Sequence, residues 1–102
     1  MQKIERFQNI KLAIQTEDFD PTIDVLTNIR AEIKNLMRIY GSILGADVYL
    51  SESNFAQPYN KLARIRVGAP GRNYFAEASS DSWPQALSEV SGKLRRQILE
   101  RY

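Results

Sequence analysis

The sequence predicts an α+β fold, a two-layer sandwich in which two helices cover one face of a four-stranded sheet in the order βαβββα. Three observations lead to this class. One alternating apolar and polar segment comes first, a long segment with helical apolar spacing follows, and three strand-like segments then precede a final helix. Strands grouped in this way favour a sandwich over a parallel doubly wound sheet. With 102 residues, 43% of them hydrophobic, the chain suits one domain spanning residues 1–102.

The first predicted strand and helix lie before residue 41. Apolar and polar residues alternate over residues 10–14, which is typical of a half-buried strand. Asp20 is the expected N-cap of the first helix, Pro21 its first residue and Gly41 the residue after its end, so the helix should cover about residues 21–40. Its expected apolar stripe consists of Ile23, Leu26, Ile29, Ile33, Leu36, Met37 and Tyr40.

The three later strands and the turn between the last two are predicted from alternation and turn residues. Alternating residues mark strands near residues 47–51, 63–67 and 74–78. Pro70 and Gly71 fit the two central positions of a type II turn, because proline presets the first φ and glycine accepts the positive second one.

The second helix should begin near residue 82, with Asp81 as its N-cap and Pro84 within its first turn. Gly92 inside this helix costs about 0.5–1 kcal/mol relative to alanine, so we expect it to permit close packing against the sheet or the other helix. The expected core stripe of this helix consists of Trp83, Leu87, Val90, Leu94 and Ile98.

Composition argues against several classes of function. The chain has no cysteine and no histidine, which removes thiolate chemistry, disulfides and the commonest general base and metal ligand. Four acids near the first helix start are favoured there electrostatically, without a metal; they are Glu17, Asp18, Asp20 and Asp24. No apolar run reaches the roughly 18 residues of a membrane span. We therefore expect a binding protein rather than an enzyme, with no cofactor, no metal and no membrane partner.

Positive charge is unevenly distributed. Residues 58–102 contain eight Lys and Arg against four acids, whereas residues 1–57 contain six against eight. The predicted basic ridges consist of Arg30, Lys34 and Arg38 on the first helix and of Lys93, Arg96 and Arg101 on the second. Like charges at such spacing disfavour a helix by roughly 0.2–0.5 kcal/mol per pair, which an anionic partner would offset. A solvated face, with cations favoured near a helix C-terminus, explains the same pattern.

The outward face of the sheet is a second candidate surface. If residues 63, 65 and 67 face the helices, then the opposite face carries Arg64, Arg66, Lys11, Tyr49 and Phe75. Basic residues among aromatic ones suit RNA, because they contact phosphates and stack on bases. An ordinary solvated face with aromatic cross-strand pairs fits equally well.

Four segments resemble the ribosome hibernation-promoting factor and ribosome-associated translation inhibitor family. They are residues 63–71, 74–77, 81–87 and 93–97, and the resemblance extends over about residues 8–101. It implies the βαβββα fold and binding to the small ribosomal subunit and its rRNA, in the channel where mRNA and tRNA lie. It further implies inhibition of translation in resting or stressed cells, in the cytoplasm. Because the chain ends at Tyr102, directly after the last helix, it resembles the short members.

The resemblance also implies which residues contact RNA. By position these are Arg30, Lys34, Arg38, Arg64, Arg66, Lys93, Arg96 and Arg101. The sequence departs from the family pattern at Ala31, Glu32 and Asn35, where basic residues are common, and at Pro84, where a helix former is usual.

Two alternatives remain open at this level. A double-stranded RNA-binding domain shares the αβββα portion, but it carries a lysine cluster where residues 81–84 read Asp-Ser-Trp-Pro. A protein-interaction module would bind with weak salt dependence, whereas binding to phosphates weakens steeply as salt rises. No DNA partner is indicated, and we expect the free protein to be a monomer.

Overall fold

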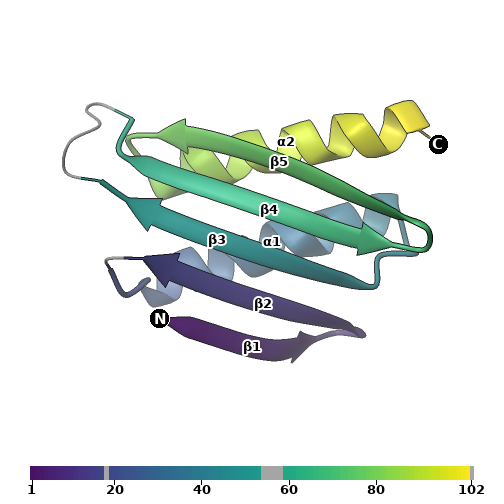
Figure 1. The fold of residues 1–102 in the computed structure, drawn as a ribbon, viewed down its shortest axis with the longest axis horizontal. Helices are drawn as coiled ribbons and strands as arrows, with labels where there is room; N and C mark the ends of the chain where they lie inside the picture. The colour runs from purple at the N-terminus through teal and green to yellow at the C-terminus, as the bar shows by residue number, and fades with distance from the viewer. Residues whose placement is uncertain (18, 54–58, 102) are drawn as a thin grey trace.

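The computed structural model describes residues 1–17, 19–53 and 59–101, and for Arg101 its backbone alone. Within this part of the chain, the helices lie together behind a single sheet (Figure 1). The elements are β1 (Gln2–Phe7), β2 (Ile10–Glu17), α1 (Ile23–Ile39), β3 (Gly45–Glu52), β4 (Lys61–Ala69), β5 (Arg72–Ser80) and α2 (Trp83–Arg101). The α+β class is confirmed, but the predicted four-stranded βαβββα order is wrong, because the sheet has five strands.

The strands lie in chain order, β1-β2-β3-β4-β5. Only the central β2–β3 pair is parallel, and α1 forms the crossover that a parallel connection requires. Every other neighbouring pair is antiparallel. The β4–β5 hairpin turns at Pro70 and Gly71, and Gly71 has φ 71°, as a type II turn requires at that position.

The strand that sequence reasoning missed is β1, at the edge of the sheet. It pairs with β2 through a two-residue turn at Gln8 and Asn9, with Phe7 opposite Ile10. Gln8 has φ 56°, a conformation that glycine and asparagine usually supply, so the turn carries no strong sequence signal. Within β1 only Glu5 and Phe7 are even half-buried. The strand therefore lacks the apolar alternation by which strands are recognised.

The start of α1 differs from its prediction. Thr22 is the N-cap, and its hydroxyl accepts a hydrogen bond from the Val25 backbone N–H at 3.2 Å, so Asp20 and Pro21 precede the helix. Ile23, expected in the core, is 79% exposed, and Val25 is buried in its place. The buried stripe of α1 consists of Val25, Ile29, Ile33 and Leu36.

The start of α2 also shifts by one residue. Ser82, rather than Asp81, occupies the N-cap, and its hydroxyl accepts a hydrogen bond from the Gln85 backbone N–H at 3.2 Å. Pro84 lies in the first turn, as predicted. The predicted stripe of α2 is confirmed in full, since Trp83, Leu87, Val90, Leu94 and Ile98 are all buried.

The core lies between the sheet and the two helices. The inward-facing residues of β2 to β5 alternate with exposed or half-buried ones, as a sheet with one covered face requires. Tyr74 is buried and packs edge-on against the half-buried Tyr40, with ring centroids 6.4 Å apart. The inward residues of the three central strands include Leu12, Ile14, Val48, Leu50, Ala63, Ile65 and Val67.

The expectation of close packing at Gly92 is wrong. A Cβ atom built on this glycine meets no atom within 4 Å outside its own helix backbone and chain neighbours. The two helices and the sheet therefore do not require a glycine at this position.

Candidate nucleic-acid interface

Charge is segregated along the length of the fold. Figure 1 shows α1 and α2 running in the same direction, and both end beside the turn that joins β4 to β5. Most exposed acids near the helix starts lie at the opposite end, where β2 ends at Glu17, α1 begins after Asp20 and α2 begins after Asp81. Glu100, in the last turn of α2, is an exposed acid at the first end. We call the first the basic end, and its cations are Arg6, Lys11, Lys34, Arg38, Arg72, Arg95 and Arg96.

The predicted ridge on α1 divides into two kinds of cation. Lys34 and Arg38 are exposed, and neither forms an ion pair with another residue that the structure describes. Arg30, in contrast, holds Glu5 of β1 through two contacts, Nη2 to Oε1 at 2.9 Å and Nε to Oε2 at 3.3 Å. The two side chains are 29% and 22% exposed. Arg30 thus joins α1 to β1 instead of projecting a free charge.

We predict that Glu5→Ala loosens β1. The two-point contact with Arg30 is half-buried, and hydrogen bonds to charged groups contribute about 1.5–3 kcal/mol, so we expect a loss of about 1–2 kcal/mol in the free energy of unfolding. Faster hydrogen exchange at the amides that pair β1 with β2 would show the loosening directly. Gln2→Ala, at an exposed position of the same strand, is the matched control. Unchanged exchange in Glu5→Ala would contradict the structural role of the pair.

The cations of α2 likewise fall into different groups. The Lys93 ammonium donates a hydrogen bond to the Glu77 carbonyl oxygen at 2.8 Å, and the Gln97 side-chain amide donates one to the Phe75 carbonyl oxygen at 2.7 Å. Both carbonyls lie on β5, an edge strand, so α2 covers that edge. Arg96 is exposed and, among the described residues, unpaired, whereas nothing is described of the Arg101 side chain.

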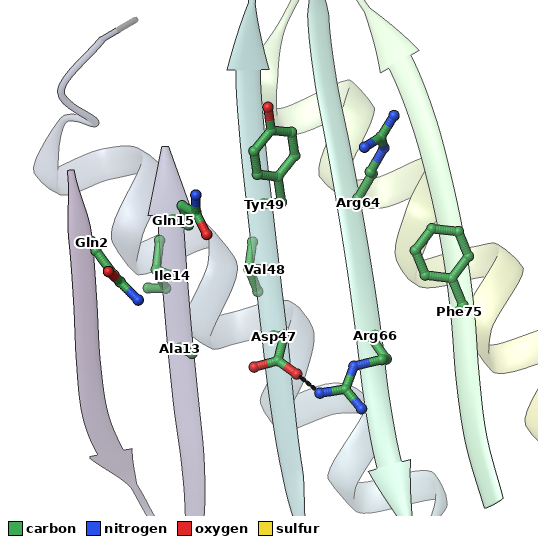
Figure 2. A pocket seen from close by; sticks show the side chains of 10 residues that line it. All are labelled: Gln2, Ala13, Ile14, Gln15, Asp47, Val48, Tyr49, Arg64, Arg66 and Phe75. Atoms are coloured by element: carbon green, nitrogen blue, oxygen red, sulfur yellow. Dashed lines mark hydrogen bonds and ion pairs between the residues drawn. The ribbon is translucent and has the colours of Figure 1, made fainter. Parts of the chain in front are cut away.

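The helix-free face of the sheet carries two arginines, both drawn in Figure 2, that are paired with acids. Arg64 Nε lies 2.8 Å from Glu77 Oε2, and its guanidinium lies 5.5 Å from the centre of the Tyr49 ring. Arg66 forms an ion pair with Asp47, which Figure 2 shows between β4 and β3. Each of the two arginines is therefore balanced by an acidic side chain, and these two residues do not make this face strongly basic.

The same face contains a shallow hollow of about 440 Å³ that is bordered by Tyr49, Phe75, Arg64 and Arg66. Phe75 is 53% exposed. The pKa of Tyr49 is raised above its usual value, chiefly because its hydroxyl donates a hydrogen bond to the Glu17 carboxylate, with burial adding to the shift. The register confirms that Lys11, Tyr49, Arg64, Arg66 and Phe75 share this face.

The geometry thus brings together some of the predicted site residues and separates others. Lys34, Arg38 and Arg96 are exposed cations at the basic end, while Arg30, Arg64 and Arg66 have acidic partners. Sequence reasoning missed three further exposed cations there, Arg6, Arg72 and Arg95. Arg72 follows the Pro-Gly turn directly, a signal that could have placed it. Exposed cations gathered at one end form a surface suited to phosphates.

Membranes and metal ions are two other kinds of partner to compare with the described part of the chain. Neither helix there is long and apolar enough to cross a membrane. Residues 1–17, 19–53 and 59–101 contain no group of three or more acids placed to hold a metal ion, and Asp18, one of the four predicted acids, lies outside these ranges.

Comparison with known proteins shows what the whole chain is similar to. Among solved structures, a ribosomal subunit interface protein from Coxiella burnetii matches with a TM-score of 0.77 and 14% identity over 88% of this chain and 94% of its own. The N-terminal domain of Protein Y from Thermus thermophilus matches with a TM-score of 0.75 and 20% identity over 93% of this chain and 100% of its own. At these identities the likeness shows the fold alone.

The sequence comparison goes further. No curated protein matches the chain. A family model described as sigma 54 modulation protein / S30EA ribosomal protein matches residues 12–102, which leaves β1 outside the matched range. This match confirms the relationship that residues 63–97 suggested, and the two structural likenesses agree with it in fold. The chain belongs to the sigma 54 modulation protein / S30EA ribosomal protein family, which is that of the ribosome hibernation-promoting factors.

Proposed function

We propose that this protein binds the small ribosomal subunit through its basic end, which contacts phosphates of the rRNA. One observation carries the proposal: exposed cations from α1, α2 and the β4–β5 turn gather where both helices end, and the described residues provide Lys34, Arg38 and Arg96 with no acidic partner. Charge of this kind supplies most of the affinity of proteins for nucleic acid backbones. Because the chain belongs to a family of ribosome-associated proteins, we take the nucleic acid to be rRNA.

Within the subunit, we infer that the protein occupies the channel of mRNA and tRNA and so inhibits translation. It inhibits by filling this channel and excluding mRNA and tRNA, in the cytoplasm of resting or stressed cells, without catalysis, cofactor or metal. A free monomer suffices for this, because the buried stripes of both helices are used within one core. Arg30, Arg64, Arg66 and Lys93 already have partners within the fold, so they contribute less than the unpaired cations. Arg101 remains a candidate contact.

Co-sedimentation with purified small subunits tests the proposal. The protein should pellet with the subunits at about 50 mM salt and be released steeply as salt rises towards about 200 mM, with log K falling by about 0.9 for each phosphate contact per unit of log salt. Binding that hardly varies with salt would favour a protein-interaction module instead. Subunits already filled with mRNA and tRNA should exclude the protein, and undiminished binding to them would contradict the proposed location.

A further inference from the structure

Gly92 lies in the interior of α2, where neither the backbone conformation nor the packing of the protein requires a glycine. Glycine in a helix interior is less favourable than alanine. Its φ does not lie in the left-handed region, where glycine is favoured, and a Cβ atom there would meet nothing within 4 Å. Neither backbone conformation nor packing within the protein therefore explains the residue. Glycine is also used where a ligand must approach the backbone closely.

The space beside Gly92 is a small groove of about 130 Å³ between the two helices. Its two walls follow the same helical spacing, i, i+3, i+4 and i+7. The lining residues are Glu32, Asn35, Leu36 and Ile39 on α1 and Ser88, Ser91, Gly92 and Arg95 on α2. The groove therefore runs along the helices and reaches Arg95 in the direction of the basic end.

The polar groups of this groove have the chemistry of a phosphate site. Ser91 is 7% exposed, and its side chain forms no hydrogen bond with another residue that the structure describes. The hydroxyl is not among the buried side-chain atoms that lack a partner, so it is accessible to solvent and can donate a hydrogen bond to a group that enters the groove. Ser88, the Asn35 amide and the Arg95 guanidinium add exposed donors along the same line.

Charge determines which part of the groove suits an anion. Glu32, half-buried, is the only acid among its lining residues and stands at the N-terminal side of both walls. Arg95 stands at the other side, and the unpaired Lys34, Arg38 and Arg96 belong to the same helices. An anion would therefore lie over Ser91, Gly92 and Arg95, away from Glu32.

We propose that this groove receives the sugar–phosphate backbone of RNA, and that Gly92 allows a phosphate to approach α2 closely. The inference rests on the proposed function and adds the place where the RNA strand crosses the helical layer. A side chain at residue 92 would stand in the path of the strand. Ser91 and Arg95 would donate hydrogen bonds to the same phosphate or to its neighbour.

Two substitutions at the glycine and one at the serine test the inference. Gly92→Ala should raise the Tm by about 2–8 °C, because alanine favours the helix and meets open space. Gly92→Leu should weaken binding to purified small subunits at least about tenfold, the loss expected when one hydrogen bond to a charged group is broken. Gly92→Ala should weaken binding less than Gly92→Leu. Ser91→Ala should lower the affinity for small subunits about tenfold, as Gly92→Leu does, while leaving the Tm nearly unchanged.

The control is Thr27→Leu, which adds the same apolar side chain at an exposed position of α1 outside the groove. It should bind like the wild type. If the wild type binds and Gly92→Leu binds equally well, the groove inference is overturned while the proposed function stands. If the wild type itself does not bind, both fail. Should Gly92→Leu not fold, equal binding by Gly92→Ala and Ser91→Ala would overturn the inference by itself.

Discussion

Replacing Trp83 with alanine should lower the free energy of unfolding by about 3–5 kcal/mol, the usual loss for a large aromatic side chain removed from a core. Trp83 is 8% exposed although it is the first residue of α2. Its ring stacks on that of Phe19, with centroids 5.0 Å apart and an angle of 15° between the planes. It therefore ties the start of α2 to the segment that leads into α1.

The side chain of Trp83 borders a hollow in the structure. This hollow of about 410 Å³ is also bordered by Val25 and Asn28, so truncation would enlarge an existing space. The Asn28 side-chain oxygen, at the same hollow, is buried without a hydrogen-bond partner among the described residues. Loss of volume without collapse is the condition under which core truncations are most costly.

Thermal or urea unfolding measures the effect. Trp83→Phe is the matched variant, because it keeps an aromatic ring for Phe19 to stack on and should lose much less stability. A loss below about 1 kcal/mol in Trp83→Ala would show that the ring does not support the core. Binding to small subunits should persist in both variants under folding conditions, since Trp83 lies far from the end where the helices stop.

Local patterns predicted the helices better than their ends. The stripe of α2 was predicted in full because apolar residues recur at helical spacing. The caps shifted to Thr22 and Ser82 because a hydroxyl one or two residues further along competes with Asp20 and Asp81, and sequence alone does not decide between them. β1, which pairs with the adjacent β2 at the edge of the sheet, was missed because it lacks apolar alternation and because its turn at Gln8 carries no strong sequence signal.

The candidate site shows the same limit. Sequence identified the cations, but whether a cation is free depends on acids far along the chain. Glu5 lies 25 residues from Arg30, Asp47 lies 19 from Arg66 and Glu77 lies 13 from Arg64. Only the folded register brings these pairs together. The structure thus narrows eight predicted contacts to a smaller set of exposed, unpaired ones.

Reversing that smaller set, Lys34, Arg38 and Arg96, to glutamate should abolish co-sedimentation with small subunits. All three side chains are exposed and make no ion pair within the described residues, so the substitutions should leave the Tm nearly unchanged. Arg30 is left intact, because its reversal would oppose Glu5 and unsettle β1. The variant therefore separates loss of binding from loss of fold.

Single substitutions measure how much an individual cation contributes to binding of the small subunit. Arg38→Glu and Lys3→Glu change the net charge equally, but Lys3 lies on β1 outside the basic end. A local phosphate contact should make Arg38→Glu weaken binding strongly and Lys3→Glu only slightly. Neutral Arg38→Gln should flatten the plot of log K against log salt by about one unit of slope, as expected for one lost phosphate contact.

General attraction between a positive protein and a negative subunit would instead weaken Arg38→Glu and Lys3→Glu alike, since such attraction depends on total charge. Equal losses in the two variants would therefore overturn the assignment of the basic end. Unaltered co-sedimentation of the triple variant would exclude it altogether. Strong loss in Arg38→Glu with near wild-type binding in Lys3→Glu is the expected result, because phosphate contacts act over about the 8–10 Å that salt leaves unscreened.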